Sequence, residues 1–255
     1  MGGIWTGVRE RVLALREAPN WRLVFGADAG RHGHGFELSP VLTEEQVRAV
    51  ERRLGFGFPP EYRSFLLEVG AGGAGPDYGL FPVRPMGPAA AEPAAPQGTV
   101  PEGTVPEGAP AEDTAPEARR HERPFRPELT QELDAHESAE PQRAAYADTT
   151  EGEARFVRDY RAWDARYDEL HDELTEGTLC VSEQGCAYYT LLAVTGPERG
   201  TMWDDVRAVG EGVVPIRHKG KDKGKGKDKE RVTFAEWYLH WLAYAERQAL
   251  AEQPD

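Results

Sequence analysis

Hydrophobic residues recur with helical spacing in two stretches near the start of the chain. The first follows a Thr43–Gln46 capping box and stops at Gly55, a residue suited to ending a helix. The second begins at Pro60, which fits the first position of a helix, and closes at Gly70. In both stretches apolar side chains fall three or four residues apart, so one face of each helix is expected to be buried.

Two later stretches show the same periodicity. The apolar positions of the first alternate in steps of four and three: Phe156, Tyr160, Trp163, Tyr167, Leu170 and Leu174. The second follows a Thr233–Glu236 capping box and is expected to bury Phe234, Trp237 and Trp241. The pattern therefore predicts a long amphipathic helix with an aromatic stripe, and a last helix rich in aromatic residues.

Short apolar runs beside turn residues indicate strands. Trp21–Phe25 is one such run. Thr178–Glu183 and Cys186–Thr195, separated by Gln184 and Gly185, predict a hairpin, and Thr201–Trp203 predicts a third strand after a Gly/Pro turn. Helices, then contiguous strands, then a helix indicate an α+β fold, with several helices packed on a mostly antiparallel sheet.

The first of two low-complexity segments covers residues 85–150. It contains a tandem Gly-Thr-Val-Pro-Glu repeat, which cannot support regular helix or sheet, and few apolar anchors. It is predicted to be a disordered insertion rich in Pro, Gly and Glu, with a marginal helix near Glu128–Glu137. Residues 1–84 and 151–255 are then expected to form one domain.

The second low-complexity segment is a basic loop at residues 217–231. All six lysines of the protein lie between Lys219 and Lys229. Such a run could touch nucleic acid, but no aromatic residue is interleaved to stack on bases. A solvated loop is the favoured interpretation.

Composition narrows the classes of function. Hydrophobic residues make up 39% of the chain, and a net charge of −14 would repel phosphate backbones and anionic lipid. This charge serves either solubility or attraction to a cationic partner. The chain has no apolar run near the roughly 18 residues of a membrane span, no apolar core of a signal peptide, and two cysteines, so a cytoplasmic protein is expected.

No motif supports catalysis, a metal or a cofactor. The pair His32 and His34 lacks the further ligands that a metal site requires, and Cys180 and Cys186 do not have the spacing of a metal motif. The glycine-rich run at 70–76 follows a helix and has no Lys-Ser/Thr after it, so it fails as a phosphate loop. A nucleophile elbow is also absent. We expect a protein that is not an enzyme.

Three blocks in this order resemble the SUKH superfamily, which includes bacterial immunity proteins and the yeast cell-wall assembly regulator. The first runs from Leu42 to Phe81, with the pattern helix–Gly–Phe–x–x–Pro–x–x–Tyr and a closing Tyr-Gly-Leu; the others run from Leu179 to Trp203 and from Phe234 to Leu242. Matching residues expected to be structural are Glu51, Gly55, Pro59, Tyr62, Gly79, Gly185, Trp203 and Trp237. The α+β domain that this resemblance implies agrees with the pattern above.

The resemblance also implies binding without catalysis. Bacterial relatives are immunity proteins of polymorphic toxin systems, and each neutralises a cognate toxin, often a nuclease with a cationic groove. An acidic chain would be steered onto such a basic partner. The alternative is an intracellular regulatory scaffold with several weak partners, which a disordered insertion would suit. A third class, a hydrolase or nucleotide-binding enzyme, would need a pocket with convergent polar groups, for which the sequence gives no sign.

Exposed acidic residues with a few aromatic anchors would carry a toxin interface. The candidates are Tyr78, Glu183, Asp204 and Asp205, which fall near strand ends and turns of the predicted sheet.

Overall fold

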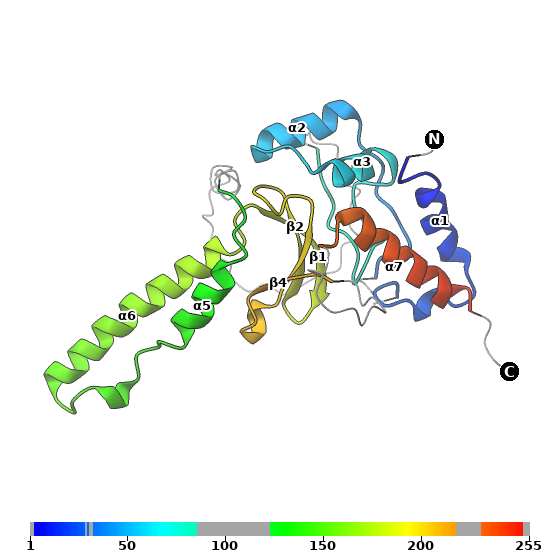
Figure 1. Ribbon diagram of the computed structural model, residues 1–255. Coiled ribbons are helices and arrows are strands. Elements are labelled where there is room, and N and C mark those ends of the chain that lie inside the picture. The colour runs from blue at the N-terminus through cyan, green and yellow to red at the C-terminus, as the bar shows by residue number, and fades with distance from the viewer. Residues whose placement is uncertain (1–2, 29, 31–32, 86–122, 218–230, 252–255) are drawn as a thin grey trace, which may run out of the picture.

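A computed structural model describes residues 3–28, 30, 33–85, 123–217 and 231–251 (Figure 1). Its centre is an antiparallel sheet in the order β1-β2-β3-β4, formed by β1 (Thr178–Gly185), β2 (Tyr188–Ala193), β3 (Met202–Asp205) and β4 (Val213–Pro215). The predicted α+β class, with helices packed on a mostly antiparallel sheet, is confirmed.

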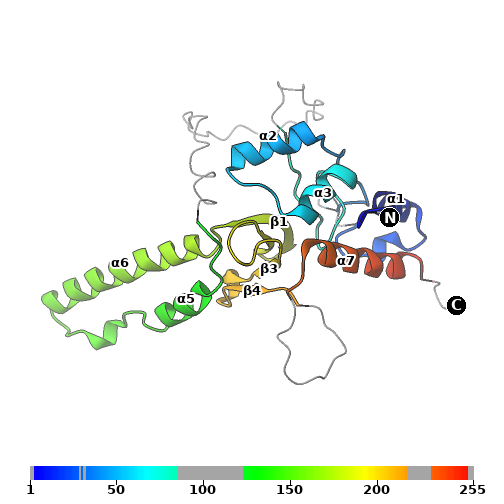
Figure 2. The ribbon, with the colours of Figure 1, turned by 45° about the horizontal axis from the view of Figure 1, so that its top comes forward.

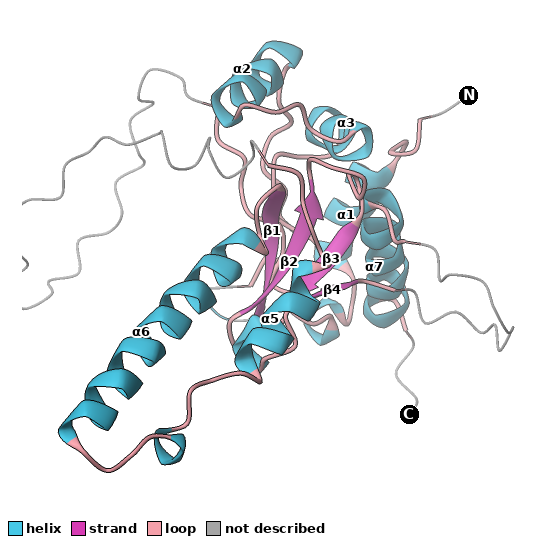
Figure 3. Cartoon of the chain, turned by 60° about the vertical axis from the view of Figure 1, so that its left-hand side comes forward, coloured by secondary structure: helices cyan, strands magenta, loops and turns pink. Residues whose placement is uncertain are grey.

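Helices cover both faces of this sheet (Figures 1 and 3). One side carries α1 (Val8–Ala14), α2 (Glu44–Leu54), α3 (Pro60–Glu68) and α7 (Phe234–Ala249), with the short 3₁₀ turns η1 (Leu15–Glu17) and η2 (Trp21–Leu23). The other side carries α5 (Leu129–Glu137), η4 (Arg143–Ala145) and α6 (Thr150–Glu173), and η5 (Arg207–Val209) lies between β3 and β4.

Side-chain alternation along the strands divides the interior into two cores. In β2 and β3, Leu192 and Met202 belong to the larger core, whereas Leu191 and Trp203 belong to the smaller one. Successive side chains of a strand point to opposite faces of its sheet, so β2 and β3 each contribute to both cores. The larger core packs against α3 and α7, and the smaller one against α5 and α6.

The local signals at the helix ends are confirmed. Thr43 and Gln46 form a reciprocal capping box at α2, as do Thr233 and Glu236 at α7. Gly55 ends α2 in the left-handed conformation. These contacts lie within three or four residues of each other, and such short-range interactions can be predicted from sequence.

The hairpin is confirmed, but its turn lies two residues later than predicted. Register shifts within β1 extend the strand through Gly185, and the two-residue turn is Cys186-Ala187, with φ values of 54° and 62°. A tight two-residue turn of this kind requires positive φ at both positions. The predicted strand at Trp21–Phe25 is wrong, because Trp21–Leu23 is a 3₁₀ turn and Phe25 is exposed.

Residues 123–150 differ from the disordered insertion that was predicted for 85–150. Phe125, Leu129 and Leu133 are buried in the smaller core, and α5 forms where a marginal helix was expected. The aromatic half of α6 extends from the sheet with α5 and η4 beside it (Figure 2). Residues 86–122 of the predicted insertion, and 218–230 of the basic loop, lie outside the described residues.

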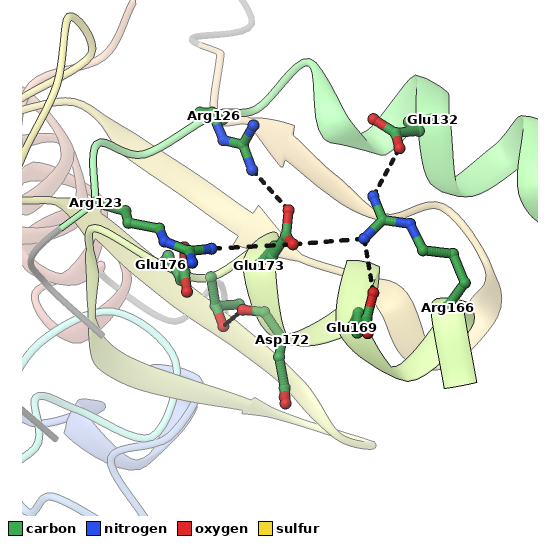
Figure 4. A network of polar contacts seen from close by, with 9 residues as sticks. Arg123, Arg126, Glu132, Arg166, Glu169, Asp172, Glu173 and Glu176 are labelled. Carbon is green, nitrogen blue, oxygen red and sulfur yellow. Dashed lines mark hydrogen bonds and ion pairs between the residues drawn. The ribbon is translucent and has the colours of Figure 1, made fainter. Parts of the chain in front are cut away.

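Arginines neutralise the acidic residues where α5 meets α6 (Figure 4). Glu173 forms ion pairs with Arg126 and Arg166, with N–O distances of 2.6 Å and 3.5 Å. Arg166 also forms an ion pair with Glu132 on α5, with an N–O distance of 2.8 Å. Arg123 lies 3.5 Å from Glu176. These carboxylates already have cationic partners within the chain, which makes this end of the sheet a poor place to receive a further cation.

Candidate partner-binding site

The structure places the two neighbouring aspartates of β3 on opposite faces of the sheet. Asp204 pairs in register with Thr190, on the face of the larger core. Asp205 pairs with Tyr189 and Val213, on the face that packs against α6. The two carboxylates therefore cannot form one contiguous patch, because consecutive residues of a strand point in opposite directions.

The Asp205 side chain is buried in an ion pair and is not an exposed acidic group. Its side chain is only 7% exposed, and Arg207 holds it through Nη2 to Oδ2 at 2.7 Å and Nε to Oδ1 at 2.8 Å. The same guanidinium donates to the main-chain oxygen of His171 on α6. The expectation of an exposed partner-binding carboxylate is wrong for Asp205, because its ion pair with Arg207 links β3 to the main chain of α6.

Tyr78 and Glu183 lie together at the β1 edge. The main-chain N–H of Tyr78 donates to the carbonyl oxygen of Glu183 at 3.3 Å. The Tyr78 ring packs against Phe25, with 5.4 Å between the centroids, and crosses close to Gly185, where a Cβ would lie 3.1 Å from the ring. By its pairing with Tyr189, the Glu183 side chain lies on the α6 side of the sheet.

Asp204 instead approaches Asp77, a residue that the sequence interpretation missed. The Nε2 of Gln184 donates to Asp204 Oδ1 at 2.6 Å and to Thr190 Oγ1 at 2.9 Å. Burial, together with the negative charge of Asp204, raises the pKa of Asp77 to about 6. Burial likewise raises the pKa of Asp204. No described residue forms an ion pair with either carboxylate, so both are desolvated without charge compensation.

The loop that carries Asp77 is fixed by close main-chain contacts. Asp77 has a φ of 57°, and Gly26 has a φ of 77°. A Cβ on Gly26 would lie 1.6 Å from the Asp77 carbonyl oxygen, so no other residue fits there. The Ser182 hydroxyl donates to Gly79 O at 2.8 Å and holds the same loop on β1. Phe25 and Asp77 are thereby brought side by side from distant parts of the chain.

A pocket of about 290 Å³ opens between this loop and α7. It is lined by Phe25, Pro76, Asp77, Trp237, His240, Trp241 and Tyr244. Phe25 is 54% exposed and Tyr244 is 37% exposed, so aromatic surface is available to solvent at its rim. The indole Nε1 of Trp241 is buried without a hydrogen-bond partner in the described part of the chain.

The residues of the expected structural motif make internal contacts. Glu51 Oε1 accepts from the main-chain N–H of Phe58 at 2.9 Å and from Arg63 Nε at 3.2 Å, which closes the turn after α2. Pro59 precedes α3, Tyr62 and Trp203 are buried, and a Cβ on Gly79 would lie 2.5 Å from Gly73 O. Trp237 is also buried, yet it lines the pocket.

Within the described residues, no group of three His, Cys, Asp or Glu side chains could hold a metal ion. His34 is a core residue whose Nδ1 accepts the Phe36 N–H at 3.1 Å, and His32 lies outside the described residues. Cys180 and Cys186 are free thiols, and burial raises the pKa of Cys180 to about 11. None of the helices described is both long and apolar enough to cross a membrane.

A family model described as the SMI1/KNR4 family (SUKH-1) matches residues 41–204, more than half of the chain. The chain belongs to the SMI1/KNR4 family. Comparison with curated proteins and with solved structures gave no match. Members of this family are generally non-catalytic immunity or regulatory proteins that bind partner proteins such as toxins.

The match locates the candidate site relative to the SUKH-1 domain. Asp77, Tyr78, Glu183 and Asp204 lie inside the matched residues. Helix α7, which lines the pocket with Trp237, Trp241 and Tyr244, follows them in the chain. The pocket is thus built jointly by the matched SUKH-1 region and by segments on either side of it, since Phe25 precedes the match.

In this SUKH-1 protein, burial acts on two ionisable groups in opposite directions, which gives a pH prediction. The pKa of His34 is lowered to about 4 from about 6.5, and that of Asp77 is raised to about 6 from about 3.8. The stability contributed by His34 is complete above pH 6.5 and is lost as the pH falls toward 4. That contributed by Asp77 is complete below pH 3.8 and is lost as the pH rises through 6.

Asp77→Asn should therefore have the same free energy of unfolding as the wild type near pH 4. Near pH 7 its free energy of unfolding should exceed that of the wild type by about 2 kcal/mol, after allowance for solvent at the carboxyl group.

His34→Asn keeps an acceptor near Nδ1. The difference between its free energy of unfolding and that of the wild type should become about 3 kcal/mol smaller as the pH falls from 7 to 4, because the wild type loses stability over that range. Urea unfolding at several pH values measures both differences. Parallel curves for all three proteins would contradict the two assignments.

Proposed function

We propose that this SUKH-1 chain neutralises a cognate protein toxin by binding it, without catalysis of its own. The observation that carries the proposal is the combination found at one end of the sheet. Asp77 and Asp204 are half-buried carboxylates without a cationic partner in the described chain, and the exposed Phe25 ring lines the same pocket as Asp77.

Two physical effects support this proposal. A cationic partner surface would compensate carboxylates that the fold has already desolvated, and exposed aromatic rings supply anchors of the kind that dominate interface energies. The net charge of −14 would speed the encounter with a basic protein, and a toxin that binds nucleic acid presents such a surface.

The partner can be identified by capture from the native host. The chain, tagged at its C-terminus, is expected to recover one dominant basic protein, identified by mass spectrometry and encoded beside it. Asp204→Asn should weaken that capture at least about tenfold, equivalent to about 1.4 kcal/mol, because it removes one of the two uncompensated charges.

Glu140→Gln is the matched control, since Glu140 is exposed in the segment between α5 and η4. Its capture should equal that of the wild type. Recovery of several sub-stoichiometric housekeeping proteins would favour the regulatory scaffold instead. Equal capture by Asp204→Asn and the wild type would remove the acidic site from the interface.

A further inference from the structure

The pocket beside α7 has the dimensions of a single side chain. Its volume of about 290 Å³ falls just below the roughly 300–1,000 Å³ of pockets that hold small molecules and cofactors. Among the described residues, its lining contains one carboxylate, from Asp77, and no lysine or arginine. Most of the remaining wall is aromatic, from Phe25, Trp237, Trp241 and Tyr244.

This wall and this carboxylate suit a cation. Aromatic faces attract a positive group within about 6 Å of the ring centre, and a carboxylate buried without a partner gains most from a charge delivered to it. Asp204, held by Gln184, adds a second negative charge nearby. A planar guanidinium satisfies both demands, because it stacks on rings while its N–H groups pair with a carboxylate. A lysine ammonium cannot stack in this way.

A second, independent feature points to a peptide as the source of the cation. Trp241 as a residue is only 7% exposed, and its Nε1 donor has no acceptor in the described chain. Buried donors of this kind are rarely left unpaired. Because Nε1 is itself buried, the Trp241 indole would have to turn in the pocket wall before a main-chain carbonyl next to the inserted arginine could accept from it.

The site is also rigid before anything binds. Gly26 and Asp77 touch through their main chains, and the Tyr238 hydroxyl donates to Ala74 O at 2.8 Å, which ties α7 to the loop that carries Asp77. Asp77 keeps its positive φ within this frame. A carboxylate and rings that are already in position lose little conformational freedom on binding.

We infer that this pocket receives one arginine side chain of the partner protein, with Asp77 as its counter-ion and the aromatic wall stacked on the guanidinium. The inference rests on the proposed function, since it names the group through which the toxin would be held. It needs no covalent step.

The test uses small probes, so it does not depend on the toxin. The full chain is titrated with N-acetyl-arginine methylamide, and the indole N–H resonances are followed by NMR after assignment by single Trp→Phe variants. Trp237 and Trp241 should shift with a dissociation constant on the order of millimolar, while Trp163 on α6 should not move. The neutral isostere N-acetyl-citrulline methylamide should cause no shift, and the lysine analogue should bind at least about threefold more weakly.

Asp77→Asn is the decisive variant, because asparagine tolerates the same positive φ and removes only the charge. It should weaken the arginine probe about tenfold, whereas Glu140→Gln should leave the titration unchanged. Equal shifts with citrulline, or an unchanged titration in Asp77→Asn, would overturn the inference. Capture of a toxin without any response to the arginine probe would overturn the pocket assignment and leave the proposed function standing. Binding of the arginine probe without capture of a toxin would support the pocket assignment and count against the proposed function.

Discussion

Phe234→Ala is expected to lower the free energy of unfolding by about 3–5 kcal/mol. Phe234 is fully buried at the start of α7, and its ring meets those of Trp5, Tyr62, Phe65, Trp237 and Tyr238 at centroid distances of 4.9–6.2 Å. Alanine would remove the ring from the point where the N-terminal segment, α3 and α7 converge. Chemical denaturation followed by tryptophan fluorescence measures the loss.

Two further variants serve as comparisons for Phe234→Ala. Phe234→Leu keeps much of the volume and should cost about 1–2 kcal/mol. Phe81→Ala removes the same side chain from a position that is exposed, and should cost less than about 1 kcal/mol. If Phe234→Ala cost no more than Phe81→Ala, the α7 junction would not be the centre of the larger core.

Arg207→Ala should be equally damaging, at about 3–5 kcal/mol, although arginine is ordinarily a surface residue. The substitution leaves the buried Asp205 carboxylate without its partner and removes the donor to His171 O on α6. The cost arises mainly from the uncompensated charge and not from the lost ion pair itself. Equilibrium unfolding in urea measures it.

The double variant Arg207→Ala with Asp205→Asn separates these contributions. It should recover more than half of the lost stability, because no charge then remains in the buried site. Arg158→Ala serves as the matched control, since Arg158 pairs with Asp159 at an exposed position and should cost about 0.5 kcal/mol or less. A double variant as unstable as Arg207→Ala alone would contradict this explanation.

Much of the fold could be predicted because its signals are local. The capping boxes at Thr43 and Thr233, the left-handed Gly55 and the periodicity of α6 each depend on residues within a few turns of one another. The errors arise where distant contacts decide. Trp21–Leu23 has the composition of a strand but finds no strand partner and coils against α7, to which Asn20 is bonded.

The predicted boundaries of the disordered insertion, residues 85–150, differ from the structure at residues 123–150 for a related reason. Residues 123–150 are mostly polar, yet three buried side chains, Phe125, Leu129 and Leu133, suffice because α6 and the sheet complete their core. Sequence alone shows those three apolar positions without the surface that covers them.

The candidate site was predicted only in part. The third strand was expected to end at Trp203, with Asp204 and Asp205 near that strand end. The strand continues to Asp205, so the two side chains point to opposite faces of the sheet. Asp77 was missed because its environment comes from Gly26, Asp204 and α7, which are far from it in the chain. The Gly-Pro-Asp-Tyr-Gly sequence around it was the one available signal.

Co-expression with the captured partner provides the decisive comparison for toxin neutralisation. Cells that produce the partner should stop growing alone and should grow when the wild-type chain or Glu140→Gln is present. Asp77→Asn, at the same protein level and with higher stability at neutral pH, should fail to restore growth. Continued arrest with the wild-type chain, or full protection by Asp77→Asn, would contradict neutralisation through the Asp77 end of the sheet.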